Sequence, residues 1–192
     1  MILLFSDLHG NKKAAQLIES IAGDFDEIIC CGDICGYNLD FSYCISMFKE
    51  IGVRSVRGNH DYMVINRWFD LDYIIDQVAI PIARTRELIN TKEIEYLESL
   101  PLSLETTDGL FVIHTFGLDQ YIMTPEACYP LLGITNLKKI AIGHTHVMQQ
   151  HFIEDITVIN PGSISKGRLG TSPSYMIIDN GKIIERRIEP WE

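Results

Sequence analysis

The first sixty residues alternate between two hydrophobic periodicities, and no other feature constrains the fold of this chain as strongly. Continuous apolar runs of strand length occur at residues 1–5, 27–31 and 53–56. Between them, residues 11–21 and 43–48 carry apolar side chains at helical spacing. Strands that alternate with helices in this way are joined by right-handed crossovers and form a mostly parallel sheet. The unbroken apolar character of the strands predicts that this sheet is covered on both faces.

The remainder of the chain predicts helices followed by short antiparallel strands. Residues 62–100 have helical character, and their last helix is expected to begin at Thr91 as the N-cap and to end before Pro101. Turn residues at 107–109 and 180–181 indicate two hairpins. The strands expected in this part of the chain are residues 102–106, 110–114, 139–142, 147–153, 157–159, 175–178 and 183–188. We expect one domain over residues 1–192 with two sheets, one beginning with βαβ units and the other ending in hairpins.

Composition narrows the class of protein. The chain is 46% hydrophobic and 22% charged, which is typical of a globular domain, and it has no apolar run of membrane-spanning length. Its first residues lack the basic flank of a signal peptide, so we expect a cytoplasmic protein. The net charge of −10 disfavours nucleic acid as a partner. The five cysteines are odd in number and form no Cys-x-x-Cys pair, which favours reduced, buried thiols, although Cys35 is close enough to Asp33 for redox sensitivity to be an alternative.

Ligand-type side chains follow five of the expected strands. These side chains are Asp7 and His9 after the first strand, Asp33 after the second, Asn59, His60 and Asp61 after the third, His114 at the end of the strand over 110–114, and His144 and His146 after the strand over 139–142. In a sheet of this kind, functional sites form beyond the carboxyl ends of the strands. Each motif alone is compatible with an ordinary turn or polar loop, but their joint occurrence after successive strands predicts a single site.

The residue types in this set favour divalent metal ions. Aspartate, histidine and asparagine together suit manganese, iron, nickel or zinc, whereas the set lacks the thiolates of structural zinc sites and the all-oxygen ligands of calcium. Seven donors are too many for one ion, but they suit two ions that share a carboxylate. Glycines next to the candidate ligands allow the sharp turns that such a site needs, and these are Gly10, Gly32, Gly36, Gly58 and Gly143.

These motifs resemble those of the calcineurin-like metallophosphoesterase superfamily. The motifs are Ser6-Asp7-Leu8-His9-Gly10-Asn11, Gly32-Asp33-Ile34-Cys35-Gly36, Gly58-Asn59-His60-Asp61 and Gly143-His144-Thr145-His146, together with His114. Tyr37 after the second motif, the later Asn160-Pro161-Gly162-Ser163, residues 83–101 and Ser174-Tyr175 are similar to the small bacterial and archaeal phosphodiesterase branch. The resemblance implies an α/β fold, a four-layer αββα sandwich with two mixed β-sheets flanked by helices.

The resemblance also implies a role for each residue. One ion would be held by Asp7, His9 and His146, the second by Asn59, His114 and His144, and Asp33 would bridge the two. His60 would protonate the leaving oxygen, and Asp61 would orient His60. Two such ions turn water into a hydroxide nucleophile near neutral pH, so the expected activity is hydrolysis of a small-molecule phosphoester. Manganese is the expected metal, with iron, nickel and zinc as alternatives.

Some positions leave open what surrounds the site. His114 is followed by Thr115-Phe116, where relatives place a glycine soon after the histidine, so Phe116 is expected to alter the mouth of the site. Asn11, Lys166 and Arg168 are candidates for phosphate contacts. Asn11 is equally suited to cap a helix, and the two basic residues are equally suited to be solvated loop charges.

Several functions remain compatible with this sequence. A phosphodiesterase is the first expectation, and a phosphomonoesterase and a non-catalytic scaffold on the same fold are alternatives. A protein Ser/Thr phosphatase is disfavoured because Gly36-Tyr37-Asn38 replaces the Asp-Arg-Gly expected after the Asp33 motif. The acidic charge disfavours a DNA nuclease. Retention of His60 and all seven candidate ligands favours an enzyme over a scaffold, and the sequence leaves a homo-oligomer open.

Overall fold

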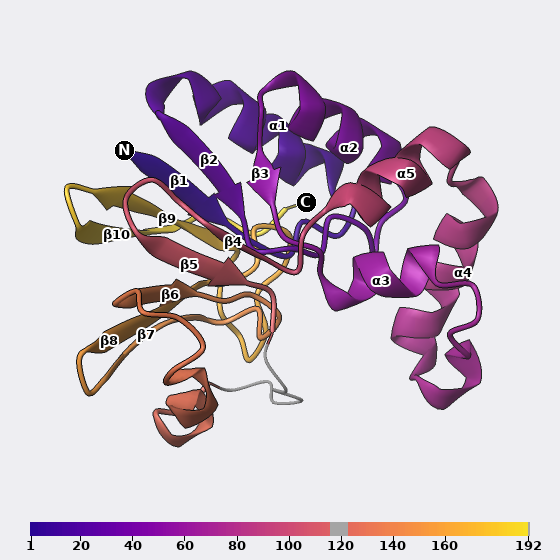
Figure 1. The fold of residues 1–192 in the computed structure, drawn as a ribbon. Helices are drawn as coiled ribbons and strands as arrows, with labels where there is room; N and C mark the ends of the chain where they lie inside the picture. The colour runs from indigo at the N-terminus through magenta and orange to yellow at the C-terminus, as the bar shows by residue number, and fades with distance from the viewer. Residues whose placement is uncertain (116–122, 192) are drawn as a thin grey trace.

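Two mixed β-sheets pack face to face in the computed structural model, which describes residues 1–115 and 123–191 (Figure 1). The first sheet has the strand order β10-β9-β1-β2-β3, with β1 at Ile2–Phe5, β2 at Glu27–Cys30, β3 at Arg54–Ser55, β9 at Ser174–Asp179 and β10 at Lys182–Arg187. The second has the order β4-β5-β6-β8-β7, with β4 at Ser103–Glu105, β5 at Leu110–Ile113, β6 at Lys139–Ala141, β7 at Met148–Ile153 and β8 at Ile156–Pro161.

The central strand β1 shows why the first sheet forms where the sequence predicts it. β1 pairs with β2 in parallel, and β2 pairs with β3 in parallel, as expected for strands joined by helical crossovers. All four residues of β1 are buried. Leu3 and Phe5 pack against the helices, whereas Ile2 and Leu4 pack between the two sheets. The unbroken apolar run therefore reflects burial on both faces.

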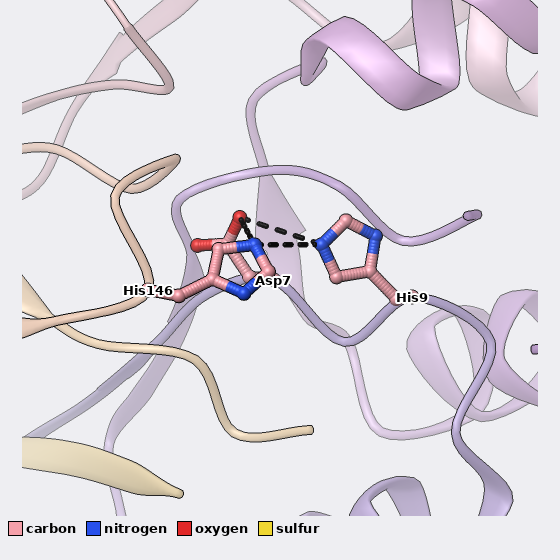
Figure 2. A group of neighbouring side chains, drawn as sticks. All are labelled: Asp7, His9 and His146. Carbon is pink, nitrogen blue, oxygen red and sulfur yellow. Dashed lines mark hydrogen bonds and ion pairs between the residues drawn. The ribbon is translucent and has the colours of Figure 1, made fainter. Parts of the chain in front are cut away.

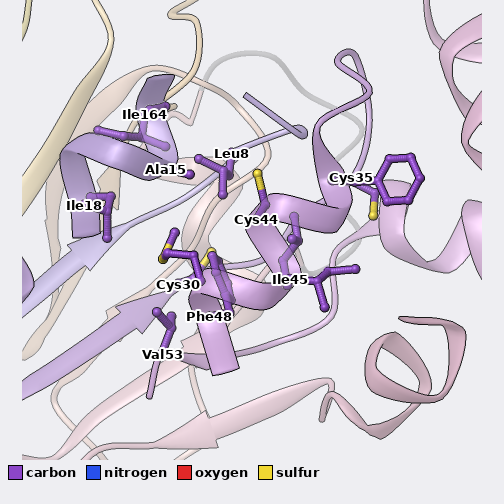
Figure 3. Packing of buried hydrophobic residues seen from close by; sticks show 14 of the residues in the cluster. Leu8, Ala15, Ile18, Cys30, Cys35, Cys44, Ile45, Phe48, Val53 and Ile164 are labelled. Carbon is purple, nitrogen blue, oxygen red and sulfur yellow. The ribbon is translucent and has the colours of Figure 1, made fainter. Parts of the chain in front are cut away.

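Helices α1 (Lys12–Ile21), α2 (Phe41–Glu50) and α5 (Thr91–Ser99) contribute to the core that covers the outer face of the first sheet. Figure 3 shows this core, in which Ala15 and Ile18 of α1 lie near Phe48 of α2 and Cys30 of β2. Helix α5 begins one residue earlier than predicted. Asn90, not Thr91, is the N-cap, because its side chain accepts from the Glu93 backbone N–H while the Glu93 side chain accepts from the Asn90 N–H.

The remaining helical segments lie at the edges of the sandwich. Helices α3 (Asn59–Ile65) and α4 (Asp76–Leu88) pack on each other to one side, with the 3-10 turn η2 (Leu71–Tyr73) between them, and η1 (Ala22–Asp24) follows α1. The outer face of the second sheet is covered by the 3-10 segment η3 (Glu126–Leu131), which buries Cys128 and Leu131 there. Two mixed sheets flanked by helices are therefore confirmed. None of the helices in the described ranges is both long and apolar enough to cross a membrane.

The closing hairpin belongs to a different sheet from the one that we expected. β9 and β10 pair with each other, and β9 also pairs antiparallel with β1, so the hairpin extends the first sheet. The physical reason is the open edge of β1, whose backbone groups need a partner strand. β9 supplies one and turns Met176 and Ile178 into the core between the sheets. Ile2 pairs with Ile178 in this register.

Candidate metal centre

The predicted ligands converge where strands of both sheets end. Three overlapping groups have ligand atoms within 4.8 Å of one another, and these groups are Asp7 with His9 and His146, His9 with Asp33 and His60, and Asp7 with Asp33 and His114. Asn59 joins the cluster through hydrogen bonds with His114 and His144. The structure therefore brings together all seven candidate metal ligands and His60. We call the set of Asp7, His9 and His146 the buried half and the set of Asn59, His114 and His144 the outer half.

In the buried half, two imidazoles face each other directly, with a carboxylate beside them (Figure 2). Nε2 of His9 lies 3.0 Å from Nε2 of His146, and Oδ1 of Asp7 lies 3.7 Å and 3.2 Å from these two nitrogens. Nδ1 of His9 lies 3.0 Å from the Cys35 carbonyl oxygen, and Nδ1 of His146 lies 3.0 Å from that of Lys166. A carbonyl oxygen only accepts hydrogen bonds, so each Nδ1 carries the proton and each Nε2 of a neutral ring presents a lone pair.

This arrangement fits a cation. Burial holds the pKa of His9 well below its usual range, so its ring is neutral and its Nε2 is bare. Asp7 Oδ1 is buried and accepts no hydrogen bond from any described residue. Burial alone would raise the pKa of Asp7, but the charges of His146 and His114 outweigh it and keep the group ionised. Imidazole nitrogens and a carboxylate oxygen therefore converge on one point. Such a group of atoms is a typical ligand set for a divalent metal ion.

The outer half is held together by its own hydrogen bonds. Asn59, the first residue of α3, presents Oδ1 to His114 Nε2 at 2.9 Å and to His144 Nδ1 at 3.0 Å. His114 Nδ1 lies 2.7 Å from the Cys31 carbonyl oxygen. Burial lowers the pKa of His114, but the charge of Asp33 and the hydrogen bond with it outweigh burial and raise this pKa to about 9. In the absence of metal, a proton on Nε2 of His114 therefore connects it to Asn59.

Asp33 lies between the two halves. Its Oδ2 is 3.8 Å from Nε2 of His9 and 3.3 Å from Nε2 of His114, while its Oδ1 accepts the His60 backbone N–H at 2.8 Å. Burial opposes ionisation of Asp33, but the charges of His114 and His60 hold its pKa well below its usual range. One carboxylate oxygen thus faces a nitrogen of each half, which is the placement that a bridging ligand requires.

The backbone at the site is strained. Asp7, His9, Asp33, His144 and His146 all have positive φ, between 49° and 68°. For residues other than glycine this left-handed conformation costs about 1–2 kcal/mol each. Strain of this kind persists where the surrounding structure enforces it, and it concentrates at functional sites. Five of the seven candidate ligands share this conformation, which turns each side chain back toward the centre at the end of its strand.

At two of the predicted glycines, the absence of a Cβ provides the space that candidate ligand side chains occupy. Gly36 has φ of 149°, and a Cβ there would collide with Nδ1 of His9 and crowd Nδ1 of His60. A Cβ on Gly58 would collide with the Asp33 carboxylate. These glycines are required because the backbone passes directly over a ligand side chain.

His60 lies beside the buried half, but Asp61 does not orient it as expected. The His60 ring centroid is 4.6 Å from that of His9, and its Nδ1 is buried without a hydrogen-bond partner among the described residues. The Asp61 carboxylate instead accepts backbone N–H groups of Asp33, Cys35 and Gly58 at 2.9–3.1 Å. The reason is that Asp61 is the third residue of α3, where a carboxylate turns back to cap the helix. Asp61 therefore positions the Asp33 loop, and burial raises the pKa of Asp61 to about 6.

Tyr37 is a site residue that we did not predict. Its ring centroid lies 4.6 Å from that of His9 and 5.1 Å from that of His60, so it packs on both. Arg168 donates to the Tyr37 hydroxyl at 3.1 Å and to the His144 carbonyl oxygen at 3.2 Å. The signal was present in the sequence, since Tyr37 directly follows Gly36, but an aromatic ring after a ligand motif has no metal-binding chemistry of its own.

The other candidates have structural roles or lie outside the site. Asn11 caps α1 by accepting the Ala14 backbone N–H at 3.1 Å and donates to Ser165, as the helix-cap alternative predicted. The side chain of Lys166 is exposed, and its carbonyl oxygen holds His146. All five cysteines are free and buried. Burial raises the pKa of the Cys35 thiol, which favours the inert alternative over redox sensitivity. Phe116 lies outside the described residues.

Comparison with known proteins agrees with this site. The calcineurin-like phosphoesterase superfamily domain matches residues 1–182. The uncharacterized protein MJ0912 of Methanocaldococcus jannaschii is 30% identical over 203 residues, which cover 93% of this chain and 82% of the relative.

Solved structures share the fold. A metallophosphoesterase from Sphaerobacter thermophilus superposes with a TM-score of 0.84 at 24% identity, covering 99% of this chain and 89% of that chain. The hypothetical protein PH1004 from Pyrococcus horikoshii superposes with a TM-score of 0.81 at 18% identity, covering 100% of this chain and 90% of the other. The match over residues 1–182 shows that the chain belongs to the calcineurin-like phosphoesterase superfamily. With its candidate metal-ligand clusters, it is a metal-dependent phosphoesterase.

Proposed function

We propose that the protein hydrolyses small-molecule phosphodiesters at a centre of two divalent metal ions, with manganese as the preferred metal. The observation that carries this proposal is the pair of Nε2 atoms of His9 and His146, which face each other at 3.0 Å beside the unsatisfied oxygen of Asp7. Because both Nδ1 atoms are turned to carbonyl oxygens, the two Nε2 atoms and Asp7 Oδ1 face one another, and a cation fits this group as a shared partner. Asp33 extends the same donor set toward the outer half.

Each half would hold one ion, and Asp33 would be shared. When bound, two divalent ions generate a nucleophile from water near neutral pH and offset the charge on phosphoryl oxygens. The chain fixes its own ligands for this task, because the carbonyl oxygens of Cys31, Cys35 and Lys166 hold three of the imidazoles in one tautomer. Asp61 holds the loop of Asp33 by accepting a hydrogen bond from the Asp33 backbone N–H.

His60 is the proposed proton donor to the leaving oxygen. An alkoxide leaves poorly from phosphorus, so a positioned acid accelerates the reaction. The ring of His60 is held by Tyr37 and His9 and is not part of either ligand half. Burial lowers the pKa of His60, and a lowered pKa makes the protonated ring a stronger acid.

A phosphodiester is favoured over a monoester by charge. A monoester brings a second negative charge into a site whose protein already carries a net charge of −10. Arg168 is a basic side chain beside the outer half, and it donates hydrogen bonds to the His144 carbonyl oxygen and to the Tyr37 hydroxyl. A phosphomonoesterase is the second candidate, since the same centre would accept a monoester if Arg168 turned toward it. The proposal includes a cytoplasmic location and a single domain over residues 1–192.

The test combines metal analysis with two chromogenic substrates. Protein loaded with manganese and freed of excess metal is expected to hold two ions per chain by elemental analysis. It is expected to hydrolyse bis(p-nitrophenyl) phosphate faster than p-nitrophenyl phosphate, and chelation should abolish both activities. A preference for the monoester would replace the diester assignment with the second candidate. Neither bound metal nor turnover with manganese, iron, nickel or zinc would contradict the proposed function and favour a scaffold.

A further inference from the structure

A pocket of about 480 Å³ opens beside the outer half of the metal centre. Asn59 and His114 form part of its wall, so the pocket and the centre share two residues. The rest of the wall comes from segments distant in sequence, including Arg57 after β3, Tyr62 of α3, Leu102 before β4, Phe111 of β5 and Ile134 after η3. A phosphoester whose phosphorus lies at the centre would therefore have one of its substituents at the mouth of this pocket.

The wall of the pocket is predominantly apolar. Leu102 is 68% exposed and Tyr62 is 46% exposed, and both line the pocket together with the partly buried Phe111. Large apolar side chains that stay in contact with water beside a catalytic centre favour a ligand that covers them. The volume is within the usual range for pockets that hold a small organic molecule. The lining thus favours an aromatic or other bulky apolar substituent over a short polar one.

Arg57 contributes a polar side chain to this otherwise mostly apolar wall. Its backbone N–H donates to the Pro101 carbonyl oxygen at 2.8 Å, which ties it to the segment that carries Leu102. Its Nε is buried and has no hydrogen-bond partner among the described residues. Buried polar groups are nearly always hydrogen-bonded in proteins, so an unpartnered donor next to a pocket indicates an acceptor supplied by a ligand. Among the described residues that line the pocket, Arg57 is the one lysine or arginine, and none is an aspartate or glutamate.

We propose that this pocket binds the organic substituent of the substrate, and that this substituent is a planar aromatic ring carrying a hydrogen-bond acceptor for Arg57. This inference rests on the proposed function and specifies its substrate class. The ring would cover Leu102 and Tyr62, the phosphorus would lie toward Asn59 and His114, and the acceptor would face Arg57. An unsubstituted aliphatic ester uses neither Arg57 nor the aromatic wall and would be a poorer substrate.

Binding of non-hydrolysable phosphonates tests the aromatic part. Isothermal titration of the manganese-loaded protein is expected to show phenylphosphonate binding about tenfold more tightly than methylphosphonate, because the ring buries apolar surface. The exposed position of Leu102 makes Leu102→Ser compatible with folding, and this variant should reduce the preference for the phenyl compound several-fold. Leu88→Ser is the matched control, since Leu88 is 61% exposed on α4 and does not line the pocket.

A second pair of ligands tests Arg57. 4-Acetylphenylphosphonate adds a carbonyl acceptor and is expected to bind about two- to tenfold more tightly than phenylphosphonate, the range of one hydrogen bond. Arg57→Met should remove this gain while leaving methylphosphonate affinity unchanged. If the acetyl gain persists in Arg57→Met, the acceptor assignment is wrong.

The outcomes separate this inference from the function on which it rests. Equal affinity for phenyl- and methylphosphonate, or no affinity for either, in protein that holds metal and hydrolyses a diester would overturn the pocket assignment alone. Absence of both metal and turnover would overturn the proposed function and the pocket assignment with it.

Discussion

The two halves of the candidate metal centre contain similar side chains in different states. In the buried half, Asp7, His9 and His146 are closed off from solvent, and Oδ1 of Asp7 has no hydrogen-bond partner among the described residues. In the outer half, Asn59 and His144 are partly exposed, and Asn59 already accepts from both histidines. A metal ion adds interactions in the buried half but replaces existing hydrogen bonds in the outer half. The comparison therefore predicts unequal affinities, with the tighter ion in the buried half.

Removing the residue shared by both halves should have the largest effect. Asp33→Ala takes away the carboxylate that faces both His9 and His114, so we expect loss of both ions and a fall in diester turnover of about a thousandfold or more. Elemental analysis and steady-state kinetics measure the two losses. Asp155→Asn is the control, because Asp155 is an exposed residue paired with Lys138. Retention of two ions by Asp33→Ala would show that the halves do not share this ligand.

His60 contacts the buried half without belonging to it, so its removal should spare both ions. His60→Gln is expected to lower kcat by about a hundred- to ten-thousandfold, the usual contribution of a positioned acid. Metal content measured on the same sample should remain at two ions per chain. Full activity in this variant would refute the acid role, and loss of an ion would make His60 a ligand.

Variants restricted to one half should distinguish the two ions by affinity. We expect His9→Gln to lose the tight ion, whereas His144→Gln should lose only the weak ion, because His144 belongs to the hydrogen-bonded outer half. Titration with manganese followed by electron paramagnetic resonance measures the tight and the weak equivalent separately. Loss of the tight equivalent in His144→Gln, or identical titrations for the two variants, would contradict the ranking.

The smallest expected effect concerns the turn above the buried half. Gly36→Ala places a Cβ against His9 and His60 in a backbone conformation that alanine disfavours, so it should destabilise the protein by about 1–3 kcal/mol and weaken the tight ion. Gly23→Ala is the matched control, because no atom lies within 4 Å of a Cβ at that position. Urea unfolding measures the free energy of unfolding of both variants. Equal stability of the two would show that the turn tolerates a side chain.

Much of the fold could be predicted because a strand that is buried on both faces, such as β1, is recognisable by its continuous run of apolar residues. The order of strands and helices and the placement of ligands at strand ends follow from periodicity alone. The partner of the closing hairpin does not, because pairing of β9 with β1 depends on which sheet edge remains open after the rest has folded. Sequence patterns predict that β9 and β10 form a hairpin, but they do not predict which sheet the hairpin joins.

The convergence of the candidate ligands was predictable from the sequence, but the groups that hold them in place were not. The carbonyl oxygens of Cys31, Cys35 and Lys166 fix three imidazoles, and every residue type supplies such an oxygen, so no sequence signal marks them. The family resemblance implied that Asp61 orients His60. Successive residues on a helix point in different directions, and Asp61 turns to the helix terminus instead.

The left-handed backbone at five of the ligands has a consequence for how this centre could be altered. Aspartate, asparagine and histidine are the side chains, after glycine, that this conformation tolerates best. They are also among the side chains that bind divalent metals. The backbone conformation and the ligand chemistry thus restrict positions such as Asp7 and His146 to the same three residue types, aspartate, asparagine and histidine. A library that exchanges only these three residue types among the five positions would sample new metal preferences while leaving the loops folded, whereas branched residues there would break the scaffold first.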